Sequence, residues 1–191
     1  LTDFAYPTRL TVLGAAATAI DFERFKMQAS LLYTFIHDHT RYAGAAAGDR
    51  DEWTPTVIAQ YKPFKNEELS LRAFYKRIFR MPTLNDLYYT FIGNKYLDPE
   101  YTTQYNIGAV WGRNFRRGIV RRVEVQADAY FNQVKDKIIA MPTSNQFQWT
   151  MLNLGHVEIV GVDAAAQLQW HFGPVAVNTR RSYTYQEAEE R

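Results

Sequence analysis

The chain has no cysteine, which excludes disulfides, thiolate chemistry and cysteine-based zinc sites. Long hydrophobic runs are also missing: the best stretches, Val12–Ile20 and Leu31–Ile36, are far shorter than the roughly 18 residues that a membrane helix needs. The formal net charge of +2 is too small to predict a nucleic-acid partner. The first residues lack the charged and apolar regions of a signal peptide. Either the protein is not exported, or residues 1–191 are a piece of a longer precursor; we expect the second.

Motifs for catalysis are missing as well. The sequence contains no glycine-rich phosphate loop, no nucleophile motif and no cluster with metal-ligand spacing, so we expect no enzyme, no metal site and no cofactor. His37 and His39 would share one face of a strand and suit a metal, but two solvated histidines are the simpler interpretation. The arginines between Arg113 and Arg122 would suit phosphate groups, but the near-neutral total charge favours a solvated turn.

What the chain has in abundance is alternation of apolar and polar residues. Aromatic residues make up 15% of the sequence, and three stretches alternate with period two: Phe25–Phe35, Val123–Phe131 and Val162–Phe172. This period predicts β-strands. Across Leu10–Ile36 a helix is the rival interpretation, because Ala, Leu and Met favour helices. Six apolar residues in strict alternation favour strands there.

The connections between these stretches alternate in length. Short turns near residues 20–22, 64–68, 112–118 and 171–174 alternate with long loops near 39–52, 81–100 and 141–146. We predict an all-β fold of about eight antiparallel up-and-down strands, near residues 8–20, 22–38, 53–63, 69–80, 101–112, 119–139, 147–170 and 174–187. Short turns on one side and long loops on the other are typical of bacterial outer-membrane barrels. Several strands exceed the roughly 9–11 residues that cross a bilayer, so they would project beyond it on the long-loop side.

Alternation alone does not place a membrane, because a soluble antiparallel β-sandwich that binds carbohydrate through aromatic loops would also alternate. Small residues on the apolar face favour the barrel, since Ala127, Ala129, Ala164 and Ala166 would fill a sandwich core poorly. Aromatic residues near the predicted strand ends favour it too, because such rings suit a membrane–water boundary.

The most specific motif follows the strand 69–80 and reads FRMPTLNDLYY from Phe79. Pro82 cannot donate a ladder hydrogen bond and ends the strand, and the polar residues after it can bond nearby backbone groups. Phe79, Arg80 and Pro82 resemble the "FRAP" box of TonB-dependent outer-membrane receptors. A second box of that family, of the "NPDL" type and leading into "PE", is similar to Asn94, Leu97, Pro99 and Glu100.

The match to the second box is loose, because Lys95 and Tyr96 stand where the family has Pro and Asp. Further on, Leu152–Trp170 resembles the family's glycine-rich start of a late strand, with Asp163 at the acidic position. The resemblance spans about residues 53–185. The order of the boxes is fairly specific, whereas each box alone is weak.

The resemblance implies a place in the bacterial outer membrane, surrounded by its lipid. It implies that 1–191 is part of a larger barrel of 22 strands whose plug domain and closing strands are absent from this stretch. The intact receptor would import a scarce small-molecule ligand (cobalamin, a siderophore or haem), energised by TonB through the missing plug region. A passive porin remains an alternative. The candidate ligand contacts in the long loop are Tyr88, Tyr89, Phe91, Asn94 and Tyr96.

Two details sharpen or oppose this prediction. Within the family the segment resembles cobalamin receptors most, because theirs also runs through an aromatic loop into a "GN…LDPE" phrase. Haem would want a histidine in the long loop, and none stands between Arg80 and Glu100, which disfavours haem receptors. Arg181 falls in the apolar register of the last strand, where arginine at the bilayer midplane costs about 2–4 kcal/mol. A position near an edge of the bilayer or a register shift at a bulge would explain it.

Overall fold

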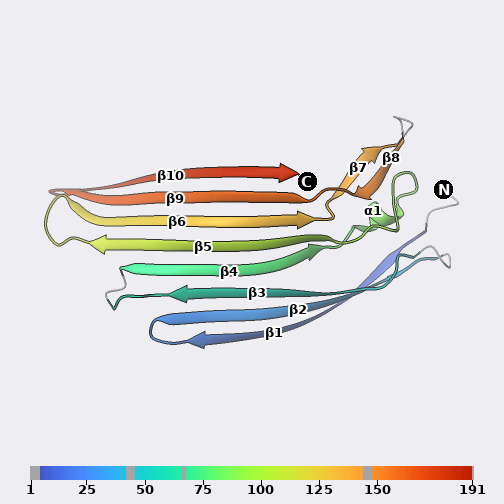
Figure 1. Cartoon of the computed structure of the whole chain (residues 1–191), viewed down its shortest axis with the longest axis horizontal. Coiled ribbons are helices and arrows are strands. Elements are labelled where there is room, and N and C mark those ends of the chain that lie inside the picture. The colour runs from blue at the N-terminus through green and yellow to red at the C-terminus, as the bar shows by residue number, and fades with distance from the viewer. Residues whose placement is uncertain (1–4, 42–45, 66–67, 144–147, 191) are drawn as a thin grey trace.

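The structure, a computed structural model, describes residues 5–41, 46–65, 68–143 and 148–190, which form ten strands and one short helix. Eight strands make the main sheet in the order β1-β2-β3-β4-β5-β6-β9-β10, all antiparallel, and β7 and β8 make a separate hairpin (Figure 1). Their bounds are β1 Thr8–Asp21, β2 Phe25–His39, β3 Arg50–Tyr61, β4 Leu69–Arg80, α1 Leu84–Tyr88, β5 Glu100–Asn114, β6 Val120–Lys135, β7 Ile138–Pro142, β8 Trp149–Asn153, β9 Val157–Phe172 and β10 Val175–Glu190.

The predicted all-β, up-and-down topology is confirmed. The segment 10–36, for which a helix was the rival, forms most of β1 and β2. The short turns gather at one end of the sheet, and the long loops gather at the other end together with α1 and the β7–β8 hairpin (Figure 1).

The sequence prediction was wrong about the length of two strands. Strands predicted over 119–139 and 147–170 are interrupted, because β6 ends at Lys135 and β9 begins only at Val157. The breaks coincide with two residues of positive φ, Asp136 at 55° and Gly155 at 92°. Positive φ lies outside the β region, so the strands end there. Between them stands the β7–β8 hairpin, and residues 144–147 of the predicted loop and strand start lie outside the described part.

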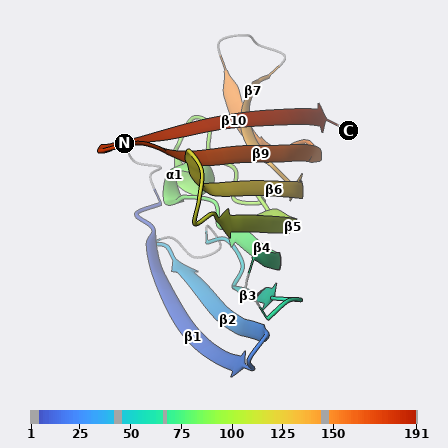
Figure 2. The same ribbon diagram turned by 90° about the vertical axis from the view of Figure 1, so that its left-hand side faces the viewer.

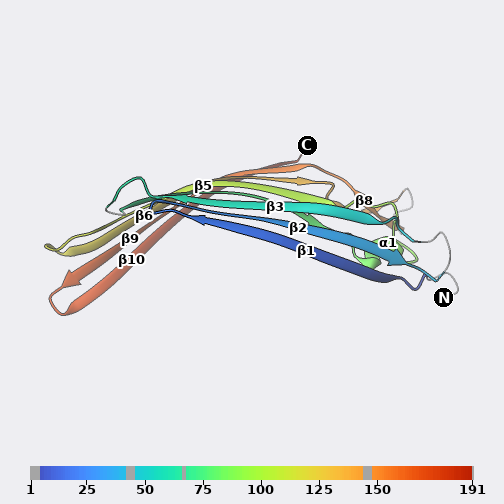
Figure 3. The ribbon, with the colours of Figure 1, turned by 90° about the horizontal axis from the view of Figure 1, so that it is seen from below.

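The main sheet is a single curved layer with no second sheet stacked on it among the described residues (Figures 2 and 3). A sandwich needs two sheets face to face, so the sandwich alternative is excluded. Large apolar side chains on the strands are open, with Ile107 at 66%, Tyr183 at 65% and Leu13 at 64% exposure. The buried apolar cluster that the described residues form lies instead at the long-loop end.

The sheet has an apolar face and a polar face. On the apolar face of β6, the alternate residues from Val123 to Phe131 span about 27 Å along the strand, close to the height of the apolar band of outer-membrane barrels. At the long-loop limit of this band, Tyr75, Tyr105 and Phe131 stand in register on adjacent strands, with ring centroids 5.2 and 6.2 Å apart. We call these three residues the ring row.

Beyond the ring row the same face becomes polar. Arg77, Thr103 and Gln133 follow it in register on β4, β5 and β6. The strands therefore continue past the apolar band on the long-loop side.

Arg181 lies on the apolar face, as its register predicted. It pairs with Ala166, which pairs with Val125 and through it lies in register with Trp111. The β9–β10 register runs without a shift, so no bulge turns Arg181 away. Arg181 therefore lies level with Trp111, which we assign to the short-turn edge of the apolar band. This places Arg181 near an edge of the bilayer.

On the polar face, two side chains reach across a neighbouring strand at glycines. Arg72 of β4 passes Gly108 of β5 to bind Asp128 of β6, with Nη2–Oδ2 at 2.6 Å, and a Cβ at Gly108 would collide with that carboxylate. Tyr130 of β6 covers Gly161 of β9 and donates to Gln186 of β10 at 3.1 Å. Only glycine leaves room for these crossings.

The pairing between β3 and β4 covers only part of both strands. Thr56–Tyr61 pairs with Leu71–Lys76, while residues 50–55 and 77–80 run on without pairing to each other. We call this boundary the β3–β4 seam; the strands diverge at its long-loop end in Figure 1. Because Lys62 donates to Arg24 of β2, the even residues of β3 bond to β2 and the odd ones to β4. Pro55 therefore lacks the donor that the next ladder bond requires, and the ladder ends there.

Candidate functional site

The loop between β4 and β5 is ordered by its own sequence. Pro82 ends β4 as predicted, and Thr83 then caps α1 with a capping box: its hydroxyl accepts from the Asp86 backbone N–H at 3.1 Å, and the Asp86 carboxylate accepts from the Thr83 N–H at 2.9 Å. After α1 the chain turns back, with the Gly93 N–H donating to the Tyr89 carbonyl at 2.7 Å. The predicted turn is thus a short helix with a reciprocal cap.

This loop packs on the β7–β8 hairpin. Leu87, Tyr88 and Leu97 from the loop and Ile138 from β7 form a buried cluster. Asn94 donates to the Met151 carbonyl of β8 at 2.9 Å. Because apolar burial and hydrogen bonds join them, residues 81–99 and the hairpin form one unit, which we call the cap.

Asn153 of β8 strengthens that unit. Its amide oxygen accepts from the Asp98 N–H at 2.7 Å, and its amide nitrogen donates to the Asp98 and Asp136 carbonyls at 2.9 and 2.7 Å. One side chain therefore joins the loop, the hairpin and the end of β6.

A buried polar cluster, the Asp38 latch, fastens the cap to the polar face of the wall. Arg9 of β1 donates to both carboxylate oxygens of Asp38 at 2.7 and 2.9 Å, and also to the Pro82 carbonyl at 2.7 Å. Tyr88 donates to Asp38 at 3.0 Å and accepts from the Ala47 N–H at 2.8 Å. The Asp38 side chain is only 2% exposed. The latch thus ties β1 and β2 to a loop from the far side of the β3–β4 seam.

The electrostatics of the latch favour the ionised carboxylate. Burial by itself would raise the pKa of Asp38, but the hydrogen bonds from Arg9 and Tyr88 outweigh it and hold that pKa below its ordinary value. Burial raises the pKa of Tyr88, so the phenol stays protonated and keeps its hydrogen to donate.

Two more polar contacts cross the open part of the seam. Arg50 of β3 binds Asp98 of the cap at 2.7 Å, and Tyr101 of β5 donates its hydroxyl hydrogen to Glu52 of β3. Side-chain contacts therefore join β3 to β5 and to the cap where β3 and β4 have no backbone hydrogen bonds to each other.

The candidate ligand contacts separate into two groups. Tyr88 is 7% exposed with its hydroxyl bonded on both sides, and Asn94 is half-buried and bonded to β8. Tyr89, Phe91 and Tyr96 are open, at 48%, 83% and 79% exposure. The first group lies inside the cap and the second lies on its surface.

The exposed group carries further contacts of its own. The rings of Tyr89 and Phe91 meet edge to face at 6.3 Å, and the Lys95 ammonium lies 5.3 Å from the centre of the Tyr96 ring.

The residues of the family boxes mostly build the cap. Pro82 and Pro99 are fully buried and Leu97 is 2% exposed. Glu100 accepts from Arg80 at 3.0 Å and from the Ile138 N–H at 3.3 Å. Phe79 is the second-last residue of β4 and pairs with Tyr101 of β5.

Sequence reasoning missed Arg9 and Asp38 altogether. Asp38 does continue the polar register of β2, but no local signal points to partners on β1 and in a loop 50 residues further on.

The predicted histidine pair is on the surface. Thr8 and Leu10 of β1 pair with His39 and His37, so both histidines share one face, and His37 contacts Asp49 at 2.6 Å. Within the described residues no three His, Cys, Asp or Glu side chains gather to hold a metal ion. Nor does that part of the chain contain a helix long and apolar enough to cross a membrane.

Comparison with known proteins gives matches over the whole chain. The model of the family described as "TonB dependent receptor-like, beta-barrel" matches residues 2–191. The chain is 32% identical over 88 residues to the vitamin B12 transporter BtuB of Vibrio vulnificus (strain YJ016), which covers 46% of this chain and 13% of the transporter. The chain thus spans about an eighth of that relative.

Solved structures share the fold. The FrpB iron transporter from Neisseria meningitidis (F3-3 variant) superposes with a TM-score of 0.65 at 15% identity, over 96% of this chain and 27% of that one. The copper transporter OprC superposes with a TM-score of 0.66 at 13% identity, over 95% of this chain and 30% of that one. The chain therefore spans only about 27–30% of the length of these two transporter chains.

Proposed function

The chain belongs to the TonB-dependent receptor β-barrel family and lies in the bacterial outer membrane, and from this premise we propose that the intact protein actively imports a scarce small-molecule ligand. Its energy would come from TonB, acting through a plug domain elsewhere in the intact protein. The remaining strands of the barrel would close the wall between β10 and β1.

The observation that carries the proposal is the cap. It is fixed to the polar, lumen-facing side of the wall by the Asp38 latch, yet it keeps Tyr89, Phe91 and Tyr96 open. Exposed aromatic rings on a preorganised support bind ligand with little loss of conformational entropy. We assign ligand contact to these three residues, and a supporting role to Tyr88 and Asn94.

Cobalamin is the first ligand to test. The relative that shares 32% identity over 88 residues is a vitamin B12 transporter. Haem is disfavoured because residues 80–100 offer no histidine as an iron ligand. A ferric siderophore remains the second candidate, since aromatic surfaces also suit its planar chelating groups.

Binding to the intact, detergent-solubilised protein tests the ligand. We expect cobalamin to bind, and the double variant Phe91→Ala, Tyr96→Ala to bind it about 10–100-fold more weakly, because each truncated ring removes apolar contact area. Tyr183→Ala, which truncates an exposed tyrosine on the apolar face of β10, is the control and should not change binding. Binding of haem or a ferric siderophore in place of cobalamin would reassign the ligand.

Uptake by cells separates active import from a passive porin. We expect accumulation of the ligand against its gradient, and its loss when TonB is deleted. Ligand flux that is unchanged without TonB would contradict active import and support the porin alternative.

A further inference from the structure

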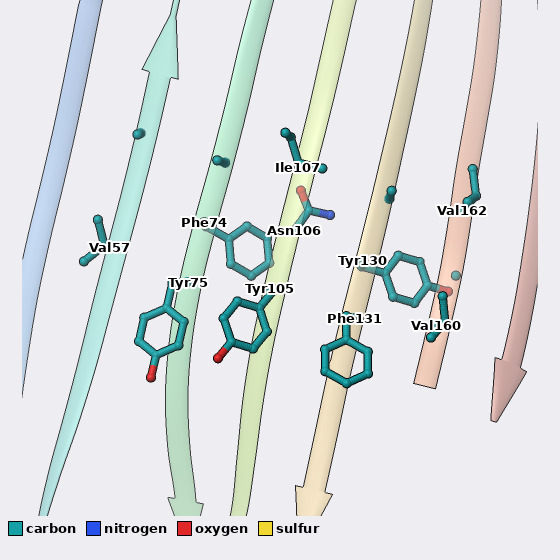
Figure 4. A pocket seen from close by; sticks show the side chains of 14 residues that line it. Val57, Phe74, Tyr75, Tyr105, Asn106, Ile107, Tyr130, Phe131, Val160 and Val162 are labelled. Carbon is teal, nitrogen blue, oxygen red and sulfur yellow. The ribbon is translucent and has the colours of Figure 1, made fainter. Parts of the chain in front are cut away.

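The apolar face carries a trough that the import hypothesis does not use. It has a volume of about 550 Å³ and lies across β3, β4, β5, β6 and β9. Its floor consists of small residues, Ala59, Ala73 and Ala129, and the ring row forms its long-loop side. Figure 4 shows Tyr75, Tyr105 and Phe131 side by side on their three strands.

The trough is apolar along its length. Besides the rings it is lined by Ile107, Val160 and Val162, and its position within the apolar band of an outer-membrane wall turns it toward hydrocarbon. A groove of small residues between large ones suits a flexible hydrocarbon chain, because the chain fills it without a polar group to desolvate.

Two cations stand beyond the ring row on the same face, Arg77 in the first row past it and Lys135 in the second. Arg77 is two residues past Tyr75 on β4, about 7 Å along the strand, and its guanidinium lies 4.9 Å from the centre of the Tyr101 ring. Lys135 of β6 pairs directly with Tyr101. Within the described residues neither cation forms an ion pair, and the Glu52 carboxylate nearby accepts from the Tyr101 hydroxyl instead. Unneutralised cations beside an apolar trough are complementary to an anionic lipid.

The side of the membrane follows from the loops. The cations lie toward the long-loop end, which in outer-membrane barrels faces outward, so they stand at the level of the external leaflet. We propose that the trough and the Arg77–Tyr101–Lys135 patch together form a binding site for a phosphorylated glycolipid of the external leaflet. One acyl chain lies in the trough below the ring row, and a phosphate lies between Arg77 and Lys135.

Lipid titration of the intact protein in detergent, followed by native mass spectrometry, tests this site. The probes are diphosphorylated lipid A, the same lipid without its phosphates, and phosphatidylglycerol. We expect the diphosphorylated lipid to bind most tightly. The double variant Arg77→Gln, Lys135→Gln should bind it about 25-fold more weakly, at roughly fivefold for each charge removed.

The matched control for charge is Lys76→Gln. Lys76 is the neighbour of Arg77 on the polar face, so its removal should leave lipid binding within about twofold. For the trough, Ala129→Trp fills the floor and should weaken binding, whereas Ala164→Trp, on the same face outside the trough, should not. This second pair decides the question if the charge variant does not assemble.

Three results would overturn the proposal. They are equal binding of phosphatidylglycerol and lipid A, unchanged lipid A binding by the charge variant, and equal effects of the two tryptophan variants. None of them depends on import, so a failure here leaves the transport hypothesis untouched.

Discussion

The two ends of the β3–β4 seam are held by different interactions. At the short-turn end Thr56–Tyr61 and Leu71–Lys76 form a regular ladder, whose bonds are local and repeat along the strands. At the long-loop end the ladder is missing, and the Asp38 latch, the Arg50–Asp98 pair and the Tyr101–Glu52 bond cross the gap instead.

This difference separates two properties of the wall. The backbone hydrogen bonds of a ladder break cooperatively, because each bond is supported by its neighbours along the strands. A few side-chain contacts open more easily, at a free energy set by one or two residues. We infer that the β3–β4 seam is uniformly stable at its membrane-embedded end and opens locally at its loop end. Asp38 would set most of the free energy of this opening.

Removing the latch carboxylate should have the largest effect. Asp38→Ala leaves Arg9 and the Tyr88 hydroxyl without their acceptor in a buried place, and we expect the cap to open more easily by about 3 kcal/mol. Hydrogen exchange at residues 87–93 of the intact protein measures this. Asp21→Ala, which removes the largely exposed partner of Lys26, is the control. Equal protection in both variants would show that the latch does not hold the cap.

Removing one latch hydroxyl should have a smaller effect. Tyr88→Phe keeps the buried ring but loses the bonds to Asp38 and to the Ala47 N–H, so we expect a loss of about 1–2 kcal/mol in the same exchange measurement. Tyr89→Phe changes an exposed neighbouring tyrosine and should leave protection unchanged. A larger effect at Tyr89 than at Tyr88 would contradict the division between support and surface.

Restoring a donor should lengthen the ladder. Pro55→Val supplies an N–H that can donate to β4, and the extended ladder should slow exchange of the Arg77 amide, the next β4 residue in register, by up to about fivefold, or about 1 kcal/mol. Pro63→Val, in the turn after β3, should not affect the seam. If the Arg77 amide exchanges as before, then something other than Pro55 ends the ladder.

Breaking the exposed pair should matter little. Arg50 and Asp98 have side chains 36% and 58% exposed, so Arg50→Gln should weaken the closure by less than about 1 kcal/mol. Added salt should reduce even this difference, because it screens exposed charges. A loss as large as that of Asp38→Ala would mean that the closure is shared evenly along the gap.

Mild acid should have no effect on the cap. The folded-state pKa of Asp38 is lowered, so its stabilisation is present above the ordinary aspartate pKa and disappears only as pH falls through the lower, folded value. Exchange at residues 87–93, corrected for its intrinsic pH dependence, should be the same from pH 7 to about pH 5 and increase only below about pH 4. Opening near pH 6 would indicate that another group controls the cap.

The sequence predicted the repetitive parts of this molecule well. Alternation from Val123 to Phe131 and from Val162 to Phe172 correctly assigned strands and their apolar face, because the period of side chains in a strand is a local property. Pro82 correctly marked the end of β4 for the same reason. The family boxes correctly indicated the barrel.

What the sequence could not predict depends on distant contacts. The β7–β8 hairpin consists of two short strands that pair only with each other, and periodicity merged them with their long neighbours. The Arg9–Asp38–Tyr88 cluster joins three segments far apart in the chain, and no local pattern announces it. Among the candidate ligand contacts, only the packed cap distinguishes the buried Tyr88 from the open Phe91.

The two glycine crossings on the polar face have a mechanical consequence. Strand pairing resists separation well but resists sliding of one strand along another less well, since a shifted register can form again two residues further on. Arg72 reaching over Gly108 to Asp128 and Tyr130 reaching over Gly161 to Gln186 each tie strands that are not adjacent, straight across one register row of the sheet. Under a force applied from the lumen, these two contacts would resist sliding of the strands along one another.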